Sequence, residues 1–210
     1  MKSMSGMWLR ARYSVAGLLR DHSGIAATEF VLIVPMMLVM FFGTVEFSSG
    51  VAIDRKVTLM ARTLANLVSQ GQTVNDTSLA GFFKASNAIM SPYPSGPTNS
   101  TVSELYIDPA TSDARVQWSQ GSAPRAVSSK VVIPASLIAL DGNGKVIPNQ
   151  YLIFSEVSYL YVPTVGYVMV KTGLTLSDVA YTRPRQSSCV FYPAPPAVVP
   201  PATQPACPTL

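Results

Sequence analysis

A long apolar run near the N-terminus constrains this 210-residue chain more than any other feature. Ile25 to Phe47 covers 23 positions, and its only ionisable side chains are Glu29 and Glu46. A helix needs about 20 apolar residues to cross the roughly 30 Å hydrocarbon core of a bilayer. A secretory signal has a shorter apolar stretch, followed by a small-residue cleavage site, and neither condition fits here. We therefore expect one transmembrane helix over residues 25–47.

Basic side chains ahead of this run indicate its orientation. The first 24 residues carry one acid, Asp21, and four basic residues, which are Lys2, Arg10, Arg12 and Arg20. These residues account for +3 of the net charge of +4. Cationic flanks stay cytoplasmic, so we expect the N-terminus in the cytoplasm and the C-terminal part outside, although Arg55 and Lys56 weaken the contrast. The remaining +1 gives no reason to expect nucleic acid as a partner.

Glu29 is the unusual residue of the apolar run. An ionised carboxylate in hydrocarbon costs roughly 2.5 kcal/mol or more, and such a residue usually has a partner. One interpretation is therefore that Glu29 needs a cation. The alternative is an acid at the helix start, in the headgroup region, where the helix dipole would favour it by about 0.3–1 kcal/mol.

The apolar spacing continues beyond the membrane segment. Apolar residues recur at helical intervals of three and four, namely Ile53, Val57, Met60, Leu64 and Leu67. We expect the first helix to run on to about Gln70, before Gly71, with this stripe packed against the protein's own sheet. Asn75 or Asp76 can cap a second helix, which the proline-rich residues 91–97 end.

Strand-like segments follow the helices. Alternating or β-branched stretches occupy residues 101–107, 115–118, 127–133, 150–162, 166–171 and 174–182. Helices first and strands afterwards predict an α+β fold with an antiparallel sheet. The domain organisation that we expect is a leader at 1–24, a transmembrane helix at 25–47, an exported domain at 48–185 and a tail at 186–210.

The tail is rich in proline, which favours an extended conformation over packed structure. It also holds both cysteines of the chain, Cys189 and Cys207, 18 positions apart. In an oxidising compartment a disulfide is the default, and it would contribute roughly 3 kcal/mol in the chain-entropy model. Two free thiols in an unpacked tail are the alternative.

A set of residues around the apolar run is typical of one group of proteins. Gly24, Glu29 five residues later, Phe30 and the apolar helix resemble class IV prepilins. In more detail, residues 24–35 resemble the TadE/TadG-like minor pseudopilins of the tight-adherence (Tad, type IVb) pilus machinery, as does the Glu46-Phe47 pair near the helix end. Short downstream matches extend the resemblance to residue 186, and they are residues 91–93, 116–119, 156–159 and 183–185.

This resemblance implies how the protein would mature and act. A prepilin peptidase would cut between Gly24 and Ile25, and the Glu29 carboxylate, next to Phe30, would neutralise the new α-ammonium of a neighbouring subunit. A pair of this kind is held firmly in low dielectric because either charge alone is costly. The implied partners are the inner membrane, the peptidase, other TadE-like pseudopilins and pilus platform proteins. Glu46 and Phe47 would form either a solvated helix exit or a partner contact.

Residues for catalysis or metal binding are scarce in the expected domain. The single histidine, His22, falls in the leader. Residues 141–145 superficially resemble a calcium loop, yet Leu152 stands where that loop needs a glutamate. We therefore expect no enzyme, cofactor, metal or small-molecule substrate. The alternative to a processed pseudopilin is an unprocessed, single-span periplasmic scaffold or binding protein.

Overall fold

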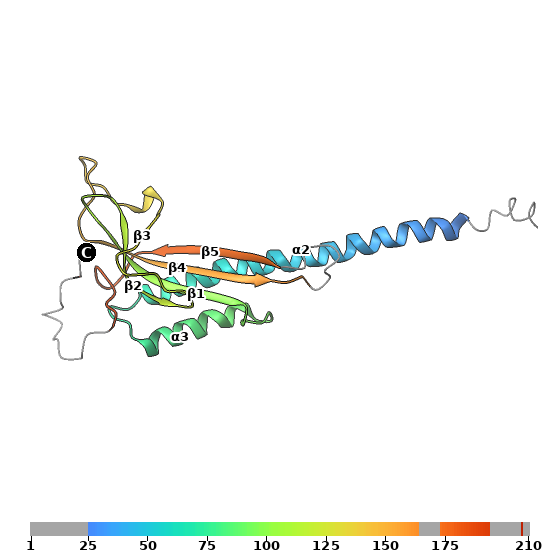
Figure 1. The fold of residues 1–210 in the computed structure, drawn as a ribbon, viewed down its shortest axis with the longest axis horizontal. Coiled ribbons are helices and arrows are strands. Elements are labelled where there is room, and N and C mark those ends of the chain that lie inside the picture. The colour runs from blue at the N-terminus through green and yellow to red at the C-terminus, as the bar shows by residue number, and fades with distance from the viewer. Residues whose placement is uncertain (1–24, 164–172, 194–206, 208–210) are drawn as a thin grey trace, which may run out of the picture. The chain divides into compact units, whose positions relative to one another are not determined.

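The computed structural model describes residues 25–163, 173–193 and 207. The chain divides into two compact units, Met1–Phe47 and Ser48–Leu210. Helix α2 (Ile25–Ser69) is followed by α3 (Asp76–Asn87) and a short 3-10 helix, η2 (Ala88–Met90). The strands are β1 (Thr98–Ile107), β2 (Ala114–Gly121), β3 (Lys130–Val131), β4 (Gln150–Tyr161) and β5 (Leu174–Thr182) (Figure 1). The predicted α+β class, with a long N-terminal helix and an antiparallel sheet, is confirmed.

Both helix predictions agree closely with the structure. Helix α2 ends at Ser69, one residue before the predicted end, and contains Pro35. Asn75 is the N-cap of α3: its side chain accepts a hydrogen bond from the Ser78 N–H at 2.8 Å, and the Ser78 hydroxyl accepts one from the Asn75 N–H. This capping box satisfies two backbone donors that the first turn of a helix leaves unpaired.

The sheet has five strands in the order β3-β2-β1-β4-β5, and every neighbouring pair is antiparallel. Its centre is the long β1–β4 pair, which runs from Thr98 opposite Tyr159 to Ile107 opposite Gln150. The strand expected over 127–133 is reduced to Lys130–Val131, because Ser128 adopts a φ of +65° that interrupts extended structure. The strand expected over 166–171 lies outside the described residues.

Within the unit of residues 48–210, the helices pack on one face of the sheet. The predicted stripe of α2 lies in this core, where Ile53, Val57, Met60 and Leu64 are buried with Val102, Trp118 and Ile153 of the sheet. Leu67 is only half-buried. The stripe is therefore the seam against the protein's own sheet, as expected. On the other face, Leu105, Val116 and Phe154 form a second cluster with apolar residues of the segment 131–146.

Candidate functional site

The N-terminal half of α2 presents apolar side chains on its surface. Of the described helices, α2 is the one that is long and apolar enough to cross a membrane. The exposed large side chains of its first part are Phe30, Val31, Leu32, Ile33, Met36, Met37, Leu38, Val39, Met40, Phe41, Phe42, Val45 and Phe47. Such a surface suits lipid or other apolar helices and not water. A single-pass membrane anchor follows from this helix.

Glu29 lies on this apolar surface. The structure places Ile25 and Glu29 four residues apart on α2, and both side chains are exposed, as is that of Phe30. The described residues include no hydrogen-bond or salt-bridge partner for the Glu29 carboxylate, and the first turn of the helix as described carries no acid. Any partner of this carboxylate therefore lies outside the described part of the chain. Gly24, which we predict to precede the cleavage point, also lies outside the described residues.

Glu46 and Phe47 differ from one another in exposure. Phe47 is 65% exposed, whereas Glu46 is only 4% exposed. The interpretation of this pair as a solvated helix exit is therefore wrong for Glu46. The two side chains lie next to one another on α2, so the difference shows that other protein atoms cover Glu46 while Phe47 stays exposed.

The C-terminal region contains an anchored segment that the sequence did not predict. Cys189 and Cys207 form a disulfide with a Cα–Cα distance of 5.8 Å, which confirms the predicted pair. Cys189 is fully buried against Tyr106 and Tyr151. The expectation of an unpacked tail from residue 186 onward is thus wrong for residues 187–192, which we call the strap. The strap is held because it supplies apolar side chains and backbone partners to the domain.

A buried carboxylate holds the centre of the strap. Glu104 on β1 is 1% exposed and lies opposite Trp118 on β2. Its Oε1 accepts a hydrogen bond from the Val190 N–H at 2.6 Å, and its Oε2 accepts one from Trp118 Nε1 at 3.0 Å. Trp118 Nε1 also donates to the Val190 carbonyl at 2.8 Å. Burial raises the pKa of Glu104 to about 8, although the two N–H donors act in the opposite direction.

Sequence reasoning passed over Glu104, yet a signal was present. The residue is the one charged side chain of β1, a strand that is buried from Ser100 to Ile107, and a charge in the middle of a buried strand requires a partner. The partners come from 14 and 86 residues further along the chain, so no local pattern identifies them.

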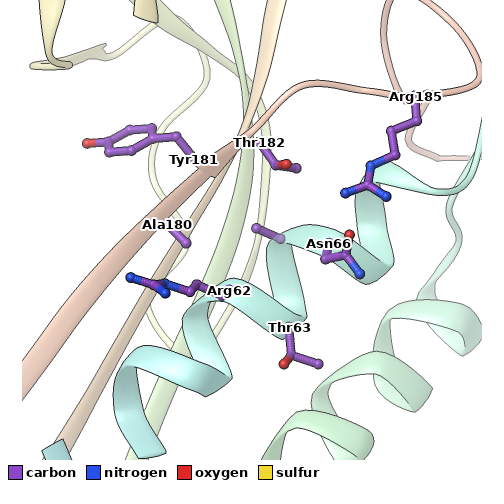
Figure 2. Close-up of a pocket in the computed structure, with 8 residues that line it drawn as sticks. Arg62, Thr63, Asn66, Ala180, Tyr181, Thr182 and Arg185 are labelled. Atoms are coloured by element: carbon purple, nitrogen blue, oxygen red, sulfur yellow. The ribbon is translucent and has the colours of Figure 1, made fainter. Parts of the chain in front are cut away.

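A shallow cavity of about 370 Å³ lies between α2 and β5. Its lining includes Arg62, Asn66 and Arg185, and Figure 2 shows the two guanidinium groups well apart from one another. The lining contains no His, Cys, Asp, Glu or Lys side chain that could activate a nucleophile, and the arginines do not converge on one point. In the described part of the chain, no group of three or more His, Cys, Asp or Glu side chains is placed to hold a metal ion.

Comparison with known proteins gives one match. Residues 24–66 match the family model described as TadE-like protein. This match confirms the suspected family over a segment of the sequence that includes Gly24, Glu29, Phe30, Glu46 and Phe47. No curated protein and no solved structure matches the chain.

Proposed function

Because residues 24–66 of this chain are a TadE-like segment, we propose that the protein is a minor pseudopilin of the Tad (type IVb) pilus machinery. It works by assembly and not by catalysis, and it supports pilus biogenesis and surface adherence. The observation that carries this proposal is the TadE-like match over a helix that has an apolar surface and, at Glu29, a carboxylate without a partner among the described residues.

Maturation is the first step of the proposed role. A prepilin peptidase removes residues 1–24, so that Ile25 becomes the first residue and carries an α-ammonium. Inside the membrane, the Glu29 carboxylate of one subunit accepts this ammonium from its neighbour. The pairing favours helix association because each charge alone is costly in a low-dielectric environment.

The proposed location is the bacterial inner membrane, with the N-terminus cytoplasmic and residues 48–210 in the periplasm. The +3 charge of the first 24 residues supports this orientation. The disulfide between Cys189 and Cys207 supports an oxidising compartment for the domain. The partners are the peptidase, a second TadE-like pseudopilin and platform proteins of the pilus machinery.

Co-expression with the cognate prepilin peptidase tests the processing step. Mass spectrometry of the protein purified from membranes is expected to show the loss of residues 1–24, with Ile25 as the new N-terminus. Gly24→Ala is expected to block the loss largely, because a side chain at this position obstructs the close approach of backbone to peptidase. An unchanged mass in cells with an active peptidase would refute processing and favour the unprocessed anchor.

Substitution of Glu29 tests the assembly step. Glu29→Ala is expected to insert into the membrane and to be cleaved, yet to lose co-purification with the second TadE-like protein and to reduce piliation. Thr28→Ala is the matched control, since Thr28 is a neighbouring residue whose hydroxyl donates to the Ile25 carbonyl of its own helix. Normal piliation with Glu29→Ala would contradict the role of the carboxylate.

A further inference from the structure

Strand β5 forms one edge of the sheet, and its outer side, which faces away from β4, is unpaired among the described residues. Its nine residues, Leu174–Thr182, pair with β4 alone and keep one register along their whole length. An edge strand presents a row of backbone N–H and C=O groups that can pair with another extended chain. We call this row, from Ser177 to Thr182, the β5 edge.

The β5 edge lacks the features by which proteins usually protect such a strand. It contains no proline, glycine or basic residue, and its one charged side chain is Asp178. Short strands, lysines, prolines and bulges are the common protections. At the other side of the sheet, β3 has only two residues and is protected by its length. Of the two described edge strands, β5 is therefore the one that is open to a partner strand.

Basic side chains lie beside the β5 edge. Ala180 and Thr182 line the cavity between α2 and β5, and Arg62 and Arg185 line it as well (Figure 2). Both arginines are exposed, and neither forms a salt bridge within the described part of the chain. The Arg185 N–H donates to the Ser69 carbonyl at 3.0 Å, which holds this residue at the end of α2. The edge is therefore accompanied by two cations that have no counterion among the described residues.

The separation of the two arginines indicates the shape of a ligand. Figure 2 shows their guanidinium groups well apart, so one small anion does not reach both. In an extended chain, side chains at alternate positions share one face and lie about 6.6 Å apart. Carboxylates at such positions can therefore meet Arg62 and Arg185 separately. On the opposite face of the sheet, the hollow beside β5 contains one cation, Arg125, which already pairs with Glu156 at 2.6 Å, so neutral side chains suit that face.

We propose that the β5 edge, with Arg62 and Arg185, binds an extended acidic segment of a partner protein, which joins the sheet beside β5. Backbone hydrogen bonds to β5 supply the affinity, and carboxylates at alternate positions facing α2 select the partner. The segment places neutral side chains on the other face. This surface lies within residues 48–210 and includes neither Gly24 nor Glu29, so its failure would leave the proposed role in pilus assembly untouched.

A synthetic peptide of alternating threonine and glutamate is the probe, and its binding to the full-length chain in detergent micelles is measured by fluorescence anisotropy. Two matched peptides serve as controls: one replaces glutamate with lysine, and one keeps the carboxylates but is N-methylated on its central amides. The glutamate peptide is expected to bind saturably, and both matched peptides are expected to bind about tenfold more weakly. Arg62→Gln combined with Arg185→Gln is expected to weaken binding about fivefold, whereas Lys84→Gln, at an exposed cation on α3, is expected to leave it unchanged.

Hydrogen exchange locates the bound peptide on the chain. In the free chain, every second amide of β5 is expected to exchange rapidly because it points away from β4, and the glutamate peptide is expected to slow these amides about tenfold. The proposal would be overturned by no binding, by equal binding of the lysine or N-methylated peptide, or by slow exchange of all β5 amides in the free chain. Slowing that appears without peptide as the chain is concentrated would also overturn it, because a second copy would then fill the edge.

Discussion

Two neighbouring basic residues of α2, Arg55 and Lys56, are expected to differ sharply in their contribution to stability. The Lys56 Nζ donates two hydrogen bonds, to the carbonyls of Ile89 and Ser91, each at 2.8 Å. These carbonyls lie at the end of the helical segment that follows α3, where backbone acceptors lack partners within the helix. Arg55 is exposed and has no such contact among the described residues.

The expected magnitude follows from these two contacts. A hydrogen bond to a charged group contributes about 1.5–3 kcal/mol. The Ile89 contact is partly buried, whereas the Ser91 contact is exposed and water can replace it. Lys56→Met keeps the aliphatic part of the side chain and removes the donors, so we expect it to lower the free energy of unfolding by about 2 kcal/mol. Arg55→Met is expected to stay within about 0.5 kcal/mol of the unmodified protein.

Urea denaturation of the full-length chain in detergent measures both values. The Trp8→Phe background leaves Trp118 as the reporter of the domain core. Hydrogen exchange should also show lower protection around η2 in Lys56→Met and unchanged protection in Arg55→Met. Equal free energies of unfolding for the two variants would refute the assignment of Lys56 as the connection between α2 and η2.

Three further predictions concern the core and the strap. The pKa of Glu104 is raised from its ordinary value of 4.5 to about 8 in the folded protein, so the free energy of unfolding should fall as the pH rises through this window, by at most about 1.4 kcal/mol per pH unit. Urea denaturation at several pH values measures this dependence, and Glu104→Gln should flatten it. Leu64→Ala, at a fully buried position, should lower the free energy of unfolding by about 2–5 kcal/mol in the same assay. Leu59→Ala, at a position that is 52% exposed, should lower it far less, and similar losses for the two variants would contradict the orientation of α2. Replacing both Cys189 and Cys207 by alanine should lower the free energy of unfolding by roughly 3 kcal/mol and reduce the protection of strap amides, and an unchanged value would contradict the anchoring role of the disulfide.

Sequence reasoning located the helices because their signals are local. The spacing of Ile53, Val57, Met60 and Leu64 identifies the buried face of α2, and the Asn75 cap lies directly before α3. In both cases, the residues that determine the structure are a few positions apart, so the periodicity and the capping chemistry suffice.

The strap and Glu46 were misjudged for the opposite reason. The prolines after residue 192 favoured an extended tail, whereas the position of Val190 depends on Glu104, 86 residues earlier in the chain. A solvated exit was one of two interpretations of Glu46, whose charge interrupts the apolar run, yet its side chain is buried. The position of the strap depends on partners far away in the sequence, and a single sequence does not display them. In contrast, Gly24 and Glu29 stand out in sequence, and the matched family segment contains them.

The place of the strap in the chain has a consequence for biosynthesis. Residues 187–192 are made after the five strands and both helices, yet Val190 completes the interior and Phe191 joins the connection between α2 and α3. A nascent chain that has been synthesised as far as Thr182 therefore has an incomplete core, because Trp118 and Glu104 still lack their hydrogen bonds to the backbone of Val190. Final closure of the domain has to wait until this late segment emerges, which makes a truncation just before it far more damaging than the small number of missing residues suggests.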